Sequence, residues 1–309
     1  MPTPRRSRRP APQSRRLTVA LAAALLLGAG TLAGCSGAPS PADDRLHVLA
    51  SFYPLEFVAE RVGGSRVTAA NLTPPGAEPH DLELTPQDVA TVSDADLVLS
   101  LSGFQPAVDD AVANTSATSL DAADFGRLDL SSADGGGVDP HFWLDPTRLA
   151  DVADAVAGRL STMDPGGAAT YTANAAGLRS DLTSLDQDFS AGLATCDSRQ
   201  LVTSHEAFGY LAERYDLRQV GIVGVGPEAE PTAADLARIS RFVADEGVTT
   251  VFYETLVSPD VAETVAQESG ATTAVLDPIE GLVADSGGDD YLTVMRDNLA
   301  SLRTGLGCK

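Results

Sequence analysis

Histidine is rare in this chain, and three of its four histidines stand where a loop or an apolar run ends. His80 ends the loop TPPGAEPH, His141 lies in DPHFWLDP, and His205 follows the run QLVTS directly. Asp277 holds a matching position after TTAVL. Three imidazoles and one carboxylate are a donor set that suits tetrahedral Zn²⁺. We therefore take these four residues as candidate metal ligands.

Each candidate also has an ordinary structural interpretation. His80 could bond to loop carbonyls, His205 could cap the helix that follows it, and Asp277 before a proline suits any turn. His47 lies inside a strand pattern and is interpreted as structural, and Trp143 is interpreted as part of the core. No single residue decides for the metal interpretation. It is favoured because the expected fold brings the four donors close to one another.

Short apolar runs alternate with helical patterns along most of the chain, which favours parallel α/β units. The predicted strands cover 46–51, 66–72, 96–101, 200–204, 218–223, 249–253 and 272–276. The predicted helices cover 54–62, 86–94, 105–113, 147–162, 206–215, 232–246, 259–269 and 289–305. The stretch 121–139 is interpreted as a loop rich in aspartate and glycine.

Residues 167–194 contain no proline and predict one further, long helix. Its apolar residues recur at spacings of three and four and form a single stripe, made of Leu178, Leu182, Leu185, Phe189 and Leu193. A helix of that length spans roughly 40 Å, too long for a crossover inside one small domain. The expected fold class is therefore α/β with two lobes. Each lobe has a small, mostly parallel sheet flanked by helices, and one long rigid helix joins them.

The candidate ligands are divided between the two expected lobes. In open α/β sheets, ligands bind beyond the carboxyl ends of the strands. His80 and His141 belong to the first lobe, and His205 and Asp277 to the second, so the four side chains can meet in a cleft between the lobes. Nearby acidic residues could orient the imidazoles through hydrogen bonds, and the candidates for this role are Glu78, Asp145, Glu206, Glu230 and Glu254.

The first 34 residues are interpreted as an export signal, because a basic stretch leads into a short apolar run that ends in small residues. The ending, LAGC, resembles the lipobox of bacterial lipoproteins, which implies that Cys35 carries the lipid. An ordinary signal peptide with a chance cysteine is the alternative. The expected organisation is a signal peptide at 1–34, a flexible tether at 35–44, an N-terminal lobe at 45–146, a linking helical segment at 147–195 and a C-terminal lobe at 196–309.

Two cysteines remain, Cys196 and Cys308. An even pair in an exported protein indicates a disulfide, with two free thiols as the alternative.

The formal net charge is −22. A surface this acidic repels nucleic acid and anionic lipid headgroups, so we expect no nucleic-acid partner.

Five segments resemble, in order, the motifs of the zinc and manganese receptors of bacterial ABC importers, the ZnuA/TroA type. They are PGAEPHDLELTPQDV, DPHFWLDP, TSHEAFGYLAERYDL, GPEAEPTAADL and VLDPIEGL, and the resemblance covers nearly all of 45–306. It implies two α/β lobes joined by a rigid helix, with one metal ion between them held by His80, His141, His205 and Asp277. It also implies a monomer, anchored by its N-terminal lipid to the outer face of the cytoplasmic membrane, that serves a membrane permease.

The chain departs from the pattern of this family in two places. Many zinc-specific members carry a histidine-rich loop before the second ligand, whereas 121–139 contains no histidine. Some zinc members also place a glutamate directly before the first histidine. Here Pro79 holds that place and Glu78 lies one residue further back, which leaves Asp277 as the better fourth ligand, with Glu78 or water as alternatives.

The expected function is that of a zinc receptor without enzymatic activity. Manganese-type members tend to replace the third histidine by glutamate, whereas this chain keeps His205, and nitrogen ligands favour Zn²⁺ over Mn²⁺. A manganese or iron receptor is the nearest alternative. A zinc-dependent hydrolase is a distant one, because His205-Glu206 does not continue to a second histidine four residues on. A surface adhesin is another distant alternative.

Overall fold

The computed structural model describes residues 45–131, 137–283 and 286–309. The expected signal peptide, Cys35 and the tether up to residue 44 lie outside the described residues, as does part of the loop 121–139. Among the helices that the structure describes, none combines the length and apolar character needed to cross a membrane.

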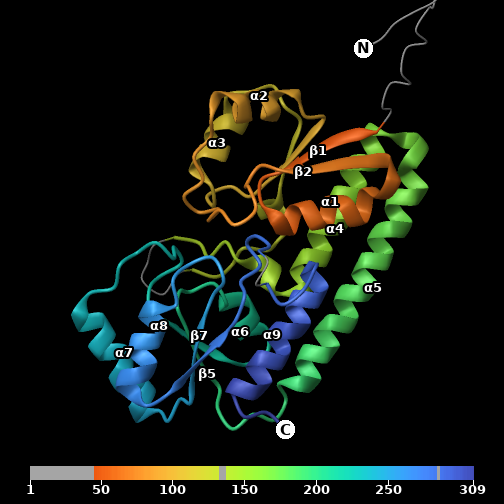
Figure 1. Cartoon of the computed structure of the whole chain (residues 1–309). Helices are drawn as coiled ribbons and strands as arrows, with labels where there is room; N and C mark the ends of the chain where they lie inside the picture. The colour runs from red at the N-terminus through yellow and green to blue at the C-terminus, as the bar shows by residue number, and fades with distance from the viewer. Residues whose placement is uncertain (1–44, 132–136, 284–285) are drawn as a thin grey trace, which may run out of the picture. The chain divides into compact units, whose positions relative to one another are not determined.

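The first lobe is built on a four-stranded sheet in the order β2-β1-β3-β4, with every neighbouring pair parallel. Its strands are β1 (Leu46–Ala50), β2 (Val67–Asn71), β3 (Leu97–Ser100) and β4 (Ser119–Asp121). Its helices are α1 (Tyr53–Gly63), α2 (Pro86–Asp94) and α3 (Pro106–Ala113), with short 3₁₀ turns at Gly64–Arg66 and Ala122–Asp124 (Figure 1). The predicted strands and helices of this lobe are confirmed, whereas the edge strand β4 was not predicted.

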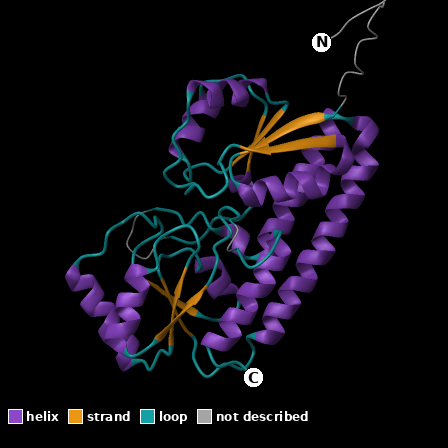
Figure 2. Ribbon diagram, viewed as in Figure 1, coloured by secondary structure: helices purple, strands orange, loops and turns teal. Residues whose placement is uncertain are grey.

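The second lobe repeats this arrangement with the order β6-β5-β7-β8, again with all pairs parallel. Its strands are β5 (Gln200–Thr203), β6 (Arg218–Gly221), β7 (Thr250–Tyr253) and β8 (Thr272–Val275). Its helices are α6 (Gly209–Arg214), α7 (Ala233–Asp245), α8 (Asp260–Ser269) and α9 (Tyr291–Gly305) (Figure 2). In both sheets the chain leaves the first strand on one side and later continues on the other, which creates the switch point where open α/β sheets bind ligands.

Two packed helices connect the lobes. They are α4 (Pro146–Met163), which follows a 3₁₀ turn at Phe142–Leu144, and α5 (Ala168–Gly192), which follows one at Pro165–Gly167. The 25 residues of α5 span about 37 Å. It packs against α4, against α1 of the first lobe and against α9 of the second, and Figure 1 shows it running alongside both. Its leucine stripe is buried as expected, and the two-lobe α/β fold with a long joining helix is confirmed.

One hydrophobic core continues through both lobes, which belong to a single compact unit. Trp143 is fully buried in it, as expected, and its Nε1–H donates to the carbonyl of Pro278 at 2.7 Å. The hydroxyl of Tyr291 donates to the carbonyl of Trp143 at 2.6 Å, and the backbone N–H of Tyr291 donates to Tyr53 Oη at 3.0 Å. Side chains and backbone from the two lobes are thus bonded directly to each other.

The expected disulfide is present between Cys196 and Cys308. It joins the chain just before β5 to the chain just after α9, over a sequence separation of 112 residues. This link lies at the amino end of β5, away from His205 at the carboxyl end.

Candidate metal centre

The three candidate histidines meet between the lobes. His80 lies on the loop after β2, His141 directly precedes the 3₁₀ turn at Phe142–Leu144, and His205 follows β5. The Nε2 atoms of His80 and His141 lie 3.3 Å apart, and the rings of His141 and His205 are 5.4 Å apart between centroids. His141 and His205 are buried, whereas His80 keeps 13% of its side chain exposed. The structure therefore brings together three of the four residues that the sequence singled out.

The fourth member of the group is Glu280. Its Oε1 lies 3.0 Å from His141 Nε2, 3.5 Å from His205 Nε2 and 3.6 Å from His80 Nε2. The four potential ligand atoms all lie within 4.8 Å of one another. Glu280 is fully buried, and a buried carboxylate among three imidazoles matches the donor set of a tetrahedral zinc site.

Asp277 lies outside this group, in which Glu280 occupies the position that was expected for Asp277. The Asp277 carboxylate accepts hydrogen bonds from the backbone N–H of Ile279 at 2.7 Å, from Ser286 Oγ at 2.8 Å and from Thr255 Oγ1 at 3.1 Å. These bonds use both carboxylate oxygens and fix the turn that leads to Glu280. Asp277 thus helps to hold the turn that presents Glu280 to the histidines.

Carboxylates orient two of the imidazoles from the opposite side of the ring. His141 Nδ1 lies 2.8 Å from Asp139 Oδ1, and His205 Nδ1 lies 2.7 Å from Glu254 Oε1. When Nδ1–H donates to a carboxylate, Nε2 is left as the atom that can bind a metal. Glu254 was expected in this role, whereas Asp139 was missed, although it stands two residues before His141 in DPHFWLDP.

The other acidic residues expected to orient histidines have different contacts. Glu78 Oε1 accepts from the backbone N–H of His80 at 3.1 Å, so it holds the loop and not the ring. Asp145 caps the first turn of α4. Glu230 is exposed and lines a pocket of about 410 Å³, and Glu206 lines a separate pocket of about 300 Å³.

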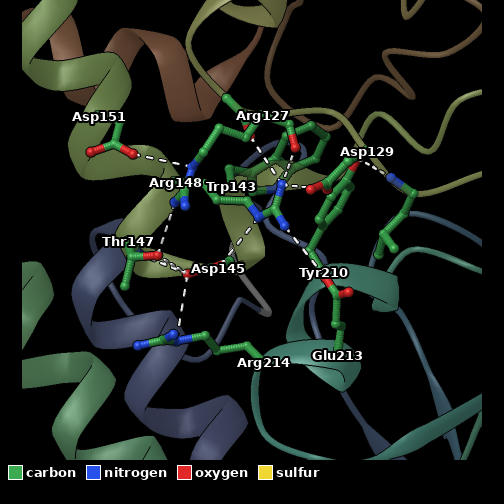
Figure 3. A network of polar contacts seen from close by, with 12 residues as sticks. Arg127, Asp129, Trp143, Asp145, Thr147, Arg148, Asp151, Tyr210, Glu213 and Arg214 are labelled. Atoms are coloured by element: carbon green, nitrogen blue, oxygen red, sulfur yellow. Dashed lines mark hydrogen bonds and ion pairs between the residues drawn. The ribbon is translucent and has the colours of Figure 1, made fainter.

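A buried arginine connects the segment around His141 to the second lobe. Arg148 of α4 donates to Asp129 Oδ1 at 2.8 Å, to Asp145 Oδ2 at 3.3 Å and to Glu213 Oε2 of α6 at 3.4 Å. It also bonds to the backbone carbonyl of Arg127. Figure 3 shows its guanidinium at the centre of these contacts. One side chain therefore ties together the loop before His141, the start of α4 and helix α6.

Tyr210 extends this network to the partner of His141. The guanidinium of Arg148 stacks 4.4 Å from the centre of the Tyr210 ring (Figure 3). The Tyr210 hydroxyl donates to the carbonyl of Asp139 at 3.0 Å and accepts from the backbone N–H of Leu130 at 3.4 Å. The position of Asp139, and through it the orientation of the His141 ring, therefore depends on contacts from α6.

The buried charges of the site perturb its titration. Burial alone would lower the pKa of His205, but the adjoining carboxylates of Glu254 and Glu280 outweigh it and raise that pKa to about 10. Burial would raise the pKa of Glu280, yet its bonds to the three imidazoles hold the pKa well below the usual range. Burial, reinforced by the charge of Glu280, raises the pKa of Glu78 to about 9. A metal ion that binds the imidazoles must therefore displace protons.

Comparison with known proteins agrees with this geometry. The family model described as the zinc-uptake complex component A, periplasmic (ZnuA), matches residues 48–305. The high-affinity zinc uptake system protein ZnuA of Bacillus subtilis is 30% identical over 308 residues, covering 94% of this chain and 97% of the relative. The zinc-binding protein AdcA of Streptococcus pyogenes is 33% identical over 289 residues, and the match spans 85% of this chain but only 56% of AdcA.

Solved structures extend the likeness to the fold. The Zn(II)-bound ZnuA-like domain of Streptococcus pneumoniae AdcA is similar with a TM-score of 0.73 and 31% identity, covering 85% of this chain and 99% of that domain. The laminin-binding protein Lmb of Streptococcus agalactiae, described as a bifunctional protein with adhesin and metal transporting activity, is similar with a TM-score of 0.77 and 32% identity, covering 84% and 99%. The family model covers nearly all of both lobes, and this chain therefore belongs to the ZnuA family of zinc-uptake components.

Proposed function

We propose that this chain is an extracytoplasmic zinc receptor that captures Zn²⁺ between its lobes and delivers it to the permease of an ABC importer. The proposed ligands are His80, His141, His205 and Glu280. The observation that carries the proposal is the convergence of these four donors, which come from four separate loops of both lobes, within 4.8 Å of one another. The function is capture and release, with no catalytic step.

Zinc is favoured over manganese by the types of the donor atoms. Three imidazole nitrogens and one carboxylate oxygen suit Zn²⁺, whereas harder ions such as Mn²⁺ prefer sites that are richer in oxygen. The orienting contacts from Asp139 and Glu254 also fit a tetrahedral site, because they leave the Nε2 atoms of His141 and His205 facing Glu280. The zinc-bound relative supports the same choice.

The N-terminal sequence supports export and lipid anchoring. We propose that residues 1–34 are removed and that Cys35 carries the lipid. Residues 35–44 then tether the folded part of the chain to the outer face of the membrane. That part consists of the N-terminal lobe at 45–146, the linking segment at 147–195 and the C-terminal lobe at 196–309. AdcA of Streptococcus pneumoniae, 31% identical over 290 residues, is described as a zinc-binding lipoprotein. A monomeric receptor on such a tether can reach a permease in the same membrane.

Metal titration of purified variants tests the assignment. The chain without its export signal, stripped of metal with a chelator, should bind one equivalent of Zn²⁺ and should bind Mn²⁺ far more weakly. His141→Ala and His205→Ala should each lower the zinc affinity by at least about two orders of magnitude. Circular dichroism checks that both variants stay folded.

A fourth histidine provides a matched control. His47 lies exposed in β1, outside the group between the lobes, so His47→Ala should bind zinc as the unaltered chain does. Equal zinc titrations in His141→Ala, His205→Ala and His47→Ala would contradict the proposal.

A further inference from the structure

Three carboxylates, of which Glu254 and Glu280 are buried, meet directly beside the histidines. One oxygen from each of Glu78, Glu254 and Glu280 lies within 4.8 Å of the other two. Glu78 comes from the loop after β2, Glu254 follows β7 and Glu280 follows β8, so both lobes contribute. Only Glu280 belongs also to the histidine group, and the second group is therefore adjacent to the first.

Each of these carboxylates has one oxygen engaged and one without a partner. Glu78 Oε1 accepts from the backbone N–H of His80 at 3.1 Å. Glu254 Oε1 lies 2.7 Å from His205 Nδ1, and Glu280 Oε1 lies 3.0 Å from His141 Nε2. The Oε2 atoms of all three glutamates are buried and have no hydrogen-bond partner. The side chains of Glu254 and Glu280 are only 1% and 0% exposed.

A buried carboxylate oxygen without a partner is costly, and the two on Glu254 and Glu280, whose side chains are almost fully buried, call for a positive charge beside them. Three oxygens that lie at most 4.8 Å apart share a point no more than about 2.8 Å from each of them, close to the range of calcium–oxygen distances. The donors are oxygens only, which hard divalent cations prefer and which differ from the nitrogen-rich set next to them.

An acidic pocket lies next to this position and shares Glu254 with it. The pocket of about 410 Å³ is lined by Ser204 and Glu254 and by the exposed acids Glu228 and Glu230. Fixed negative charge in a recess raises the local concentration of cations. Glu254 lines this pocket, and its Oε1 contacts His205.

We propose that Glu78, Glu254 and Glu280 form a second divalent-cation site, with oxygen ligands only, next to the zinc site. Glu280 bridges the two sites, with Oε1 toward the histidines and Oε2 toward the second cation. Water completes the coordination, since three carboxylate oxygens are fewer ligands than a hard cation takes. This site goes beyond the proposed zinc receptor, which needs one ion only.

Manganese is a suitable probe, because bound Mn²⁺ can be counted from the loss of the electron paramagnetic resonance signal of the free ion. The chain is first loaded with one equivalent of zinc, confirmed by elemental analysis, and then titrated with Mn²⁺ at about 0.15 M salt to screen the acidic surface. The expected result is one additional Mn²⁺ per chain with the zinc retained. Ca²⁺ should displace that Mn²⁺.

Two substitutions on one loop distinguish Mn²⁺ binding at the proposed site from nonspecific binding to the acidic surface. Glu78→Gln should weaken the additional Mn²⁺ at least about tenfold and keep the zinc equivalent, since the amide oxygen of glutamine can still accept the hydrogen bond from the backbone N–H of His80. Glu83→Gln, an exposed acid on the same loop outside the trio, should leave both ions unchanged. Melting temperatures check that both variants are folded.

Three results would overturn the second site. They are no additional Mn²⁺ on the zinc-loaded chain, Mn²⁺ uptake only with release of an equal amount of zinc, or equal behaviour of Glu78→Gln and Glu83→Gln. Failure of the zinc equivalent itself would count against the receptor, so the two proposals fail separately.

Discussion

Exchanging one oxygen for nitrogen at Glu280 or at Asp277 separates the two candidates for the fourth ligand. Both side chains are buried carboxylates in the same segment, three residues apart, and both Glu280→Gln and Asp277→Asn keep the shape of the side chain. The structure predicts opposite outcomes for the pair. Glu280→Gln should strongly weaken zinc binding, whereas Asp277→Asn should chiefly lower stability.

The magnitudes follow from the contacts of each carboxylate. Glu280 Oε1 faces three imidazole nitrogens at 3.0 to 3.6 Å and is fully buried. Removing one member of a buried ionic group costs about 3–5 kcal/mol, which corresponds to two to four orders of magnitude in Kd. Asp277 accepts three hydrogen bonds within the protein, of which the amide can keep one or two, so the free energy of unfolding should fall by about 1–2 kcal/mol. Zinc affinity should change by less than about tenfold.

Competition against a chromophoric zinc chelator measures the affinities, and urea unfolding of the metal-free chains measures the stabilities. The titrations are run at two pH values, because Glu280→Gln also removes a charge that raises the pKa of His141 and of His205. If Asp277→Asn weakens zinc binding as much as we expect for Glu280→Gln, and Glu280→Gln does not, the assignment of the fourth ligand is refuted.

Three further predictions concern stability. Folding raises the pKa of His205 to about 10 and that of Glu78 to about 9, so between pH 7 and 9 the folded metal-free chain binds more protons than the unfolded chain and should lose stability as the pH rises. The free energy of unfolding, measured with urea at several pH values, should fall less steeply with pH for the zinc-loaded chain than for the metal-free chain. Equal pH dependence of the two would contradict the pKa assignment. Arg148→Met should lower the free energy of unfolding by about 2 kcal/mol because it breaks a partly exposed network, whereas Arg238→Met, which breaks one surface pair, should cost less than about 0.5 kcal/mol. Reducing the disulfide should cost about 2–4 kcal/mol in the same assay and leave the zinc titration unchanged, since the link lies at the far end of β5 from the site.

Much of the fold follows from the sequence because its signals are local. Alternating apolar runs and helical periods predicted seven of the eight strands, and the capping box of Thr85 and Asp88 with Pro86 marks the start of α2 where it was expected. The three residues of β4 are too few to show a period. Helix α6 begins at Gly209, three residues later than predicted, because the chain at His205 and Glu206 is still used by the site and by the bond from Glu206 N to the Gly224 carbonyl.

The site could be predicted only as far as it depends on topology. The three histidines follow from the rule that ligands gather at the carboxyl ends of strands, together with the family resemblance. The choice between Asp277 and Glu280 depends on a turn in which Ile279 takes a positive φ of 59° and Asp277 bonds to its backbone. That bend is set by contacts with Thr255 and Ser286, which sequence spacing does not reveal.

The shared core constrains how cargo can be unloaded. Separating the lobes would break the hydrogen bond from Trp143 to the Pro278 carbonyl and the hydrogen bond from Tyr291 to the Trp143 carbonyl. It would also expose to water the apolar surface that is buried between the lobes. Moving a single loop disrupts far fewer of these contacts. The loop that carries His80 is one example, because His80 is the most exposed of the three histidines. Release of the metal by displacement of one ligand loop should therefore cost less free energy than release by separation of the two lobes.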